Sequence, residues 1–411
     1  MNAITTKDVL RPGRTGLAGR VTALAMEYLP LGFRLLRAVR PIVRFGDTVV
    51  VTRYDDVREV FLDDRSFRVP YAEKLDVIMG GQPFFLSMDD TPEYRRDTEA
   101  MRKVVRTGDL PSLAARTEQV AETIVGQANG RLEVVDALVR RTTFVLGAYF
   151  GIPDPPGADL RVWATRLFEF QFADPGNDPA LRSEVDKIAP ALRDHIQGLI
   201  EARRQSGHFG DDVLGRCLDI QARGEEGFSD DRIRTSLMGF IVGGPPQPPM
   251  VVPQALEQLL RRPDALAGAQ QAARDNDDAL LAGHVFEAMR FDPLAPALPR
   301  TATRTSIVAQ GTRRAAEVKE GATVYVAFSP AMMDARRLPD PQSFNPRRLP
   351  HEYIHFGYGH HTCFGIHMNK VMLPLMLKPL LKRPNLRRAP GPAGRLSKRG
   401  AFADQLHVEF D

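Results

Sequence analysis

The sequence of 411 residues predicts a mainly α-helical protein with small β-sheets, organised as one large domain over residues 1–411. Apolar residues recur at helical spacing along most of the chain, whereas β-branched runs of strand length are few. No low-complexity segment or Gly/Ser-rich linker divides the chain. Apolar residues make up 43% and charged residues 26%, which is typical of a folded protein with a large core.

The first strand is expected at Asp47–Arg53, where β-branched residues run straight into a helical pattern. Periodicity and N-terminal capping residues, such as Ser229 before Asp230, then predict a series of helices. We expect them at Asp55–Asp63, Pro92–Arg106, Leu110–Ala128, Asp136–Phe150, Pro155–Phe172, Pro179–Gln205, Asp211–Ala222, around Asp230–Leu260, at Pro263–Ala273 and at Asp278–Phe291.

The last third of the chain contains the remaining strand signals. We expect strands at Arg300–Val308, Ala315–Val318 and Ala322–Ala327, with a turn at Glu320–Gly321. From Pro330 to His361 the chain is expected to be mostly loop. A final helix is expected to begin just after Cys363, and Pro374 and Pro379 are expected to kink or shorten it.

Composition excludes several classes of protein. The 55 Lys and Arg nearly balance the 51 Asp and Glu, so the net charge of +4 gives no general case for nucleic-acid binding. Two cysteines, Cys217 and Cys363, exclude a disulfide scaffold and fit a reducing compartment. The uncharged stretch Thr235–Leu256 contains five prolines, which exclude a membrane-spanning helix. The segment Met1–Gly16 lacks the apolar core of a secretory signal. We expect a soluble cytoplasmic protein with no nucleic-acid or membrane partner.

The segment Phe356–Gly365 (FGYGHHTCFG) is the most informative part of the sequence. Its glycines allow positive φ angles and a close approach of the backbone to a flat ligand. Cys363 stands directly before a predicted helix, whose N-terminus stabilises a thiolate. Such a thiolate is a good axial ligand for haem iron. The alternative is a buried structural cysteine on a turn.

Zinc is a second alternative for the same segment. Five of the nine histidines lie close to Cys363 in the sequence, and together they have the ligand types of a zinc site. They are His351, His355, His360, His361 and His367. Zinc, however, does not require the Gly-x-Gly turn or the phenylalanine at the start of the loop.

The loop resembles the haem-binding loop of the cytochromes P450, which has the pattern Phe-x-x-Gly-x-x-x-Cys-x-Gly. Phe356, Gly359, Cys363 and Gly365 match it. The resemblance implies one large cytochrome P450-like domain that binds haem (iron protoporphyrin IX). It implies that Cys363 is the iron ligand and that the loop, including Gly357, contacts the haem. It extends over nearly the whole chain and is strongest to the soluble bacterial members.

Other segments agree with this resemblance. By itself, a Glu and an Arg three residues apart on a helix are common and fit a solvated surface pair. Glu287 and Arg290 also match the family's Glu-x-x-Arg motif, and Arg348 ends a segment that resembles Phe-x-Pro-x-Arg. The resemblance implies a buried charge triad of these three residues, because the planar arginine fork suits a carboxylate. It also implies that Arg300 and His361 bind the haem propionates.

The predicted central helix departs from the family pattern, in which an acid and an alcohol deliver protons during dioxygen activation. An alignment without gaps from Leu259–Pro263 places Gly243 and Gly244 on the family's small pair. Pro246 then replaces the acid and Gln247 the threonine. Proline has no proton to deliver, and glutamine is not an acid. The prolines should also open the helix and release carbonyls such as those of Ile241 and Val242.

Three functions therefore stay open. The first is a monooxygenase whose protons arrive through water or substrate. The second is a haem–thiolate enzyme that uses a peroxide or hydroperoxide, or an isomerase or dehydratase that needs no dioxygen. The third is a non-catalytic haem or accessory protein.

A second departure concerns the helix that supplies propionate ligands in the family, commonly a histidine and an arginine four residues later. Here Tyr94 and Thr98 occupy these places. Arg102, one turn further along the same face, is the candidate that replaces the arginine. The alternative for Arg102 is a solvated side chain.

Aromatic residues are the candidate walls of a substrate pocket, although such residues are more often core. They are the loop Phe67–Leu86 with Phe84 and Phe85, then Phe168, Phe170, Phe172 and Phe240, and the segment Leu294–Leu298. A pocket lined by them predicts a small apolar substrate, such as a secondary metabolite or lipid-like molecule. Cys217, among Val213, Leu214 and Leu218, is expected in the core.

Nine basic residues and no acidic ones lie between Asn369 and Gly400. They include Lys370, Lys378, Lys382, Arg383, Arg387 and Arg388. By resemblance, part of this basic block is expected to steer an acidic ferredoxin or flavodoxin. The alternative is a solvated basic tail.

Overall fold

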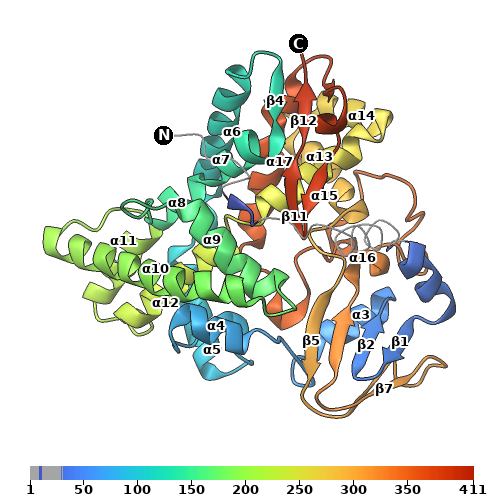
Figure 1. Ribbon diagram of the computed structural model, residues 1–411, viewed down its shortest axis with the longest axis horizontal. Coiled ribbons are helices and arrows are strands. Elements are labelled where there is room, and N and C mark those ends of the chain that lie inside the picture. The colour runs from blue at the N-terminus through green and yellow to red at the C-terminus, as the bar shows by residue number, and fades with distance from the viewer. Residues whose placement is uncertain (1–8, 12–28, 30) are drawn as a thin grey trace. The chain divides into compact units, whose positions relative to one another are not determined.

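The computed structural model describes residues 9–11, 29 and 31–411. The ribbon is mainly helical with short strands (Figure 1), which confirms the predicted fold class. The chain divides into two compact units, each described here by itself. Unit 1 comprises Met1–Arg11, Tyr71–Pro253 and His367–Asp411, and unit 2 comprises Pro12–Pro70 and Gln254–Ile366. A single domain over residues 1–411 stays a prediction.

Unit 2 contains a five-stranded sheet with the strand order β1-β2-β8-β5-β3. Its strands are β1 (Ile42–Phe45), β2 (Thr48–Val51), β3 (Phe67–Arg68), β5 (Leu298–Ala302) and β8 (Thr323–Val326). β2 runs parallel to β8, and the other neighbours are antiparallel. β2 lies inside the predicted strand Asp47–Arg53, and Val49 and Val51 are buried because alternate side chains of a strand share one face.

Helix α3 (Tyr54–Leu62) follows β2 within three residues, as predicted. Its apolar residues Val57, Val60 and Phe61 share one hydrophobic core with the buried valines of β2 and β8. This packing fixes the carboxyl-terminal end of α3, which supports the cysteine loop described below.

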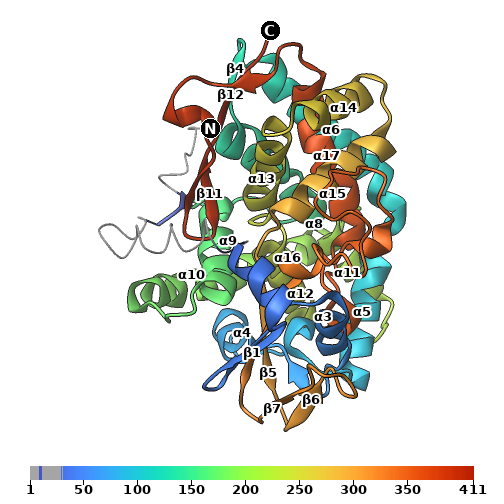
Figure 2. The same ribbon diagram turned by 90° about the vertical axis from the view of Figure 1, so that its right-hand side faces the viewer.

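The prediction of one continuous strand at Arg300–Val308 was wrong, because the structure has two strands there. β5 ends at Ala302, and β6 (Ser306–Val308) pairs instead with β7 (Ala316–Val318). The N–H of Thr303 donates to the carbonyl of Ser66, which extends the pairing of β5 with β3 by one residue before the chain leaves the sheet. Figure 2 shows this hairpin beside β5 at the bottom of the view. The other elements of unit 2 are α14 (Pro263–Arg274), α15 (Asp278–Phe291), α16 (Phe328–Ala331) and the short turns η5 (Pro350–Glu352) and η6 (Gly359–His361).

Unit 1 contains most of the helices. They are α4 (Ala72–Met79), α5 (Pro92–Val104), α6 (Leu110–Gly126), α7 (Arg141–Thr143), α8 (Val145–Phe150), α9 (Leu160–Phe168), α10 (Pro179–Ser206), α11 (Val213–Ala222) and α12 (Asp230–Gly243), with the short turns η1 (Phe85–Ser87) and η2 (Thr107–Asp109). α13 (Pro248–Leu260) and α17 (Ile366–Lys382) cross the boundaries between the units. α17 continues through Pro374 and Pro379, so the prolines do not shorten it.

Two predicted helices of unit 1 have a different form. The predicted helix Asp136–Phe150 is divided into the π-helix η3 (Val134–Arg140), α7 and α8. At the start of η3, the carboxylate of Glu133 accepts hydrogen bonds from three backbone N–H groups. The predicted helix Pro155–Phe172 begins only at Leu160, because Asp159 provides the N-cap, and its last turn is the π-helix η4 (Glu169–Ala173).

The sequence did not predict α4 or the small sheets near the carboxyl terminus. These sheets are β4-β12-β9 and β10-β11, and their strands are β4 (Arg131–Glu133), β9 (Arg387–Arg388), β10 (Ser397–Arg399), β11 (Phe402–Gln405) and β12 (His407–Glu409). Strands this short have too few residues to show a period of two. No helix among the described residues is long and apolar enough to cross a membrane. The segment Met1–Gly16 lies outside the described residues except for residues 9–11.

Candidate functional site

The loop around Cys363 has a fixed backbone. Gly357 and Gly359 have φ angles of 76° and 73°, in the left-handed region that glycine tolerates. The N–H of Cys363 donates to the carbonyl of Phe356 over 2.8 Å, and the carbonyl of Cys363 accepts the N–H of Ile366 over 3.2 Å. Cys363 is therefore held by its own backbone directly before α17, and its side chain is partly exposed.

Helix α3 supports this loop from within unit 2. A Cβ atom on Gly359 would lie 2.8 Å from the carbonyl oxygen of Phe61, so only glycine allows this approach. The next support is Arg58, whose guanidinium lies 4.4 Å from the centre of the Tyr358 ring and whose Nη2 donates to the Tyr358 hydroxyl. The sequence did not predict the pairing of Arg58 with Tyr358, because 300 residues separate them.

Two basic groups of unit 2 lie close enough to influence each other. Arg300 is 4% exposed in β5, and its guanidinium lies 5.0 Å from the centre of the Phe61 ring. Burial lowers the pKa of His361 to about 3, and the charges of His360 and Arg300 add to this effect. An anion bound between Arg300 and His361 would offset this repulsion.

These residues fit the haem that the sequence predicts. The loop provides a thiol before a helix, a cradle that only glycine fits at Gly359, and two basic groups that suit anionic propionates. The roles of Phe356, Gly357 and Gly365 in the same loop, and of Cys363 as iron ligand, stay predictions.

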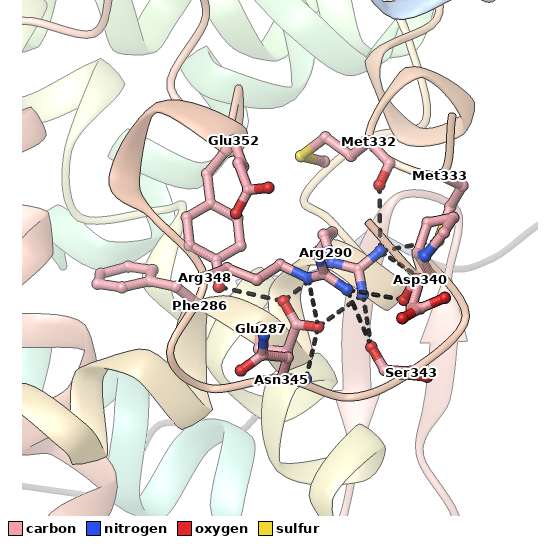
Figure 3. A network of polar contacts seen from close by, with 12 residues as sticks. Phe286, Glu287, Arg290, Met332, Met333, Asp340, Ser343, Asn345, Arg348 and Glu352 are labelled. Carbon is pink, nitrogen blue, oxygen red and sulfur yellow. Dashed lines mark hydrogen bonds and ion pairs between the residues drawn. The ribbon is translucent and has the colours of Figure 1, made fainter. Parts of the chain in front are cut away.

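The predicted triad of Glu287, Arg290 and Arg348 forms in unit 2 (Figure 3). Glu287 and Arg290 are fully buried, and Arg348 is 8% exposed. Arg290 binds both carboxylate oxygens of Glu287, with Nη2 2.6 Å from Oε1 and Nε 2.9 Å from Oε2. Nε of Arg348 lies 3.1 Å from Oε1. The alternative of a solvated Glu287–Arg290 pair is therefore wrong.

Further donors and acceptors complete this network. The hydroxyl of Tyr353 donates to Oε2 of Glu287 over 3.1 Å, and the N–H of Asn345 donates to Oε1 over 2.9 Å. The other partners of the two guanidiniums are the sulfur of Met333, which lies 3.0 Å from Nη1 of Arg290, and five backbone carbonyls. These carbonyls are those of Met332, Pro339, Asp340, Pro341 and Ser343. The network ties the long loop after α16 to α15. Burial alone would raise the pKa of Glu287, but the hydrogen bonds and charges of Arg290 outweigh it and lower that pKa.

The zinc alternative finds no support in the geometry. Among the residues that the structure describes, no three His, Cys, Asp or Glu side chains come together as metal ligands. His355 is instead bound through Nε2 to the carbonyl of Phe286 over 3.0 Å, and burial lowers its pKa to about 4.

The predicted central helix is interrupted at its prolines, as the sequence predicted. α12 ends at Gly243 and α13 begins at Pro248. The helical donors for the carbonyls of Ile241 and Val242 would be residues 245 and 246, which are prolines without an N–H. The N–H of Gln247 donates to the carbonyl of Gly244, and Nε2 of the same residue donates to the carbonyl of Gly243. The catalytic roles of Gly243, Gly244 and Gln247 stay predictions.

Tyr94 and Arg102 both lie on α5, as predicted, but their surroundings differ. Tyr94 is partly buried, and the hydroxyl of Thr98 donates to its carbonyl. Arg102 is exposed near the end of the helix. Binding of a propionate by either residue stays a prediction.

The aromatic candidates are closely packed in unit 1. The rings of Phe85 and Phe240 lie 6.3 Å apart, and those of Phe150 and Phe240 lie 5.4 Å apart. The ring of Phe84 covers Gly239 so closely that a Cβ there would lie 2.2 Å from it. Cys217 is fully buried in α11, as predicted, and burial raises its pKa to about 12.

The basic block between Asn369 and Gly400 is largely paired within unit 1. Lys378 is 3% exposed and, like Lys382, binds Glu118. The other ion pairs are Arg383–Glu122, Arg387–Glu409, Arg387–Asp411 and Arg399–Asp404. Because Lys378 is buried and paired, the solvated basic tail is wrong as a description of this residue. A partner would have to use exposed members such as Lys370.

Comparisons with known proteins agree with this geometry. The model of the family described as cytochrome P450 matches residues 176–397. The mycinamicin IV hydroxylase/epoxidase of Micromonospora griseorubida is 26% identical over 371 residues, which cover 86% of this chain and 87% of that protein. The bifunctional dioxygenase–epoxy alcohol synthase of Pyricularia oryzae is 34% identical over 85% of this chain, but the match spans only 34% of that larger protein. The crystal structure of CalO2 has the same fold, with a TM-score of 0.78 at 21% identity and coverage of 95% of this chain and 97% of that one.

Proposed function

Because the chain belongs to the cytochrome P450 family, we propose that it is a haem–thiolate monooxygenase that oxidises a small apolar molecule. The observation that carries the proposal is the loop of Cys363, whose backbone is fixed between two glycines and the start of α17. When bound, haem supplies the redox chemistry, and a thiolate ligand favours cleavage of an oxygen–oxygen bond. The task of Cys363 is to present its sulfur from a backbone whose N–H and carbonyl are both hydrogen-bonded.

Within this proposal, the basic residues orient the cofactor. Arg300 and His361 bind the propionates, with Tyr94 and Arg102 as further candidates. Phe356, Gly357, Gly359 and Gly365 shape the loop so that a flat ligand can approach the backbone. The burial of Arg300 supports this assignment, because a guanidinium that is only 4% exposed favours an anionic ligand.

We propose an apolar substrate of the secondary-metabolite or lipid-like class. Support comes from the concentration of phenylalanine around α12 and from the named activity of the Micromonospora relative, a hydroxylase and epoxidase. A ferredoxin or flavodoxin is the proposed electron donor, and its contacts must avoid the cations of the basic block that are already paired. A cytoplasmic location stays part of this proposal.

A second candidate function has a specific observation in its favour. At the break between α12 and α13, Pro246 offers no proton, and one side-chain N–H of Gln247 is engaged by the carbonyl of Gly243. An enzyme that receives an organic hydroperoxide needs no proton delivery and no electrons. The oxygen–oxygen bond of the hydroperoxide breaks, and both oxygen atoms return to the carbon chain of the same molecule. An unsaturated hydroperoxide thereby becomes an epoxy alcohol of the same composition. The name of the Pyricularia relative includes such a synthase activity.

One experiment separates the two candidates. The purified holoprotein is supplied either with NAD(P)H, a ferredoxin and its reductase in air, or with an unsaturated fatty-acid hydroperoxide under nitrogen. Oxygenated product from only the first mixture supports the monooxygenase. An epoxy alcohol that retains both oxygen atoms of a labelled hydroperoxide supports the second candidate. Inactivity in both mixtures with a broad panel of apolar substrates contradicts both and favours the non-catalytic alternative.

A pair of variants tests the role of the helix break. Replacing Pro246 by Asp and Gln247 by Thr restores the acid and the alcohol. We expect partner-driven oxygenation to rise by about a hundredfold, the lower end of the usual gain from general acid catalysis. Pro253→Ala is the matched control, because it removes a proline inside α13 and leaves the break intact. Equal rates in all three proteins would show that the missing acid does not limit the reaction.

A further inference from the structure

The helix over residues 31–39 in unit 2 exposes an apolar stripe. Leu31, Leu35 and Val39 are 62%, 65% and 76% exposed, and their spacing of four residues places them on one face. The opposite face is anchored, because Phe33 is buried and Nη1 of Arg37 donates to the carbonyl of Pro330 over 2.7 Å. In Figure 1 this is the blue helix that leads into β1.

The next element along the chain adds another exposed apolar side chain. Phe45, at the tip of the hairpin between β1 and β2, is 67% exposed. Single exposed apolar residues are normal on a protein surface. Here, however, four of the eight large exposed hydrophobic side chains of the described chain fall within residues 31–45. This grouping of exposed apolar side chains within one short segment indicates a surface that is covered by other apolar material.

The charge of the same segment identifies the chemistry of that material. Residues 28–46 contain no Asp or Glu, and the exposed arginines Arg34, Arg40 and Arg44 lie within the segment. Apolar side chains combined with arginine suit the interface of a bilayer with anionic headgroups.

We propose that Leu31, Leu35, Val39 and Phe45 form a docking surface for an anionic lipid bilayer, which the protein contacts peripherally. This proposal departs from the sequence-based prediction of no membrane partner, since that prediction considered only spanning helices. It does not depend on the haem or on the proposed reaction. It places an enzyme for apolar substrates where such molecules dissolve.

The test is co-sedimentation of the intact protein with vesicles. Phosphatidylglycerol–phosphatidylcholine vesicles are compared with pure phosphatidylcholine vesicles, at low and at high salt. We expect binding to the anionic vesicles that weakens with salt. The variant Leu35→Ser/Val39→Ser should lose it, and each of Arg34→Gln and Arg40→Gln should weaken it by about fivefold. Leu349→Ser is the matched control, because Leu349 is 58% exposed but lies outside this segment. This variant should bind the vesicles like the unchanged protein.

Two results would overturn the proposal. One is equal sedimentation of the intact protein and Leu35→Ser/Val39→Ser with the anionic vesicles. The other is failure of the intact protein to bind any vesicle together with a lower melting temperature of Leu35→Ser/Val39→Ser. That second result would show that a segment of this chain or a second copy covers the stripe.

Discussion

Replacement of Glu287 by glutamine is the most quantitative test of the buried network. The carboxylate is fully buried and accepts five hydrogen bonds, of which three come from the guanidiniums of Arg290 and Arg348. Glutamine keeps the shape, but it removes the negative charge and turns one acceptor into a donor that faces other donors. Removing one partner of a buried ion pair costs about 3–5 kcal/mol.

The assay is thermal and urea unfolding of the purified protein, followed by circular dichroism. For a chain of this length, a loss of that size lowers the melting temperature by at least about 4 °C. Arg347→Gln is the control, because Arg347 is an exposed neighbour in the same loop whose side chain lies outside the network. Its effect should stay within about 0.5 kcal/mol. Equal melting temperatures of Glu287→Gln and Arg347→Gln would refute the reasoning.

Acid provides a second readout of the same interaction. Because the pKa of Glu287 is lowered in the folded protein, its stabilisation is complete above the ordinary value of 4.5. It is lost as the pH falls through the lowered folded-state value. The difference in stability between the unchanged protein and Glu287→Gln should therefore be constant near neutral pH and shrink at strongly acidic pH.

Two further predictions concern the support of the cysteine loop by α3. In Gly359→Ala, a strained φ angle is combined with an approach of the new Cβ to within 2.8 Å of the carbonyl oxygen of Phe61. We therefore expect this variant to lose haem faster in an apomyoglobin capture assay. Gly321→Ala is the control and should retain haem, because Gly321 has a similar φ of 81° but open space around it. Arg58→Leu removes the donor to Tyr358 and should lower the temperature at which the holoprotein loses its thiolate-type spectrum by a few degrees; an unchanged temperature would show that Arg58 does not hold the loop.

Long, periodic segments and specific motifs were predictable from the sequence. Helices such as α10 and α15 follow from apolar periodicity, and the break before α13 follows from the missing N–H groups of Pro245 and Pro246. The triad of Glu287 followed from a resemblance rather than from its spacing. A spacing of three residues alone equally fits a solvated pair.

Interactions between distant segments were not predictable. The contact of Arg58 with Tyr358 and the pairing of Lys378 with Glu118 join residues that are far apart in the sequence. Nothing in a local pattern distinguishes such residues from solvated ones, which is why the basic block was expected to be a docking surface or a solvated tail. The two strands β5 and β6 were merged for a similar reason, since β5 pairs with β3 and β8 whereas β6 pairs with β7.

The absorption spectrum of the reduced, carbon monoxide-bound holoprotein tests the central claim most directly. A cysteine thiolate on the iron shifts the main band well to the red of a histidine-ligated haem. We expect the red-shifted band from the unchanged protein and its loss in Cys363→Ser. A histidine-type band from the unchanged protein, or the same spectrum from Cys363→Ser, would contradict the assignment of Cys363 as the iron ligand.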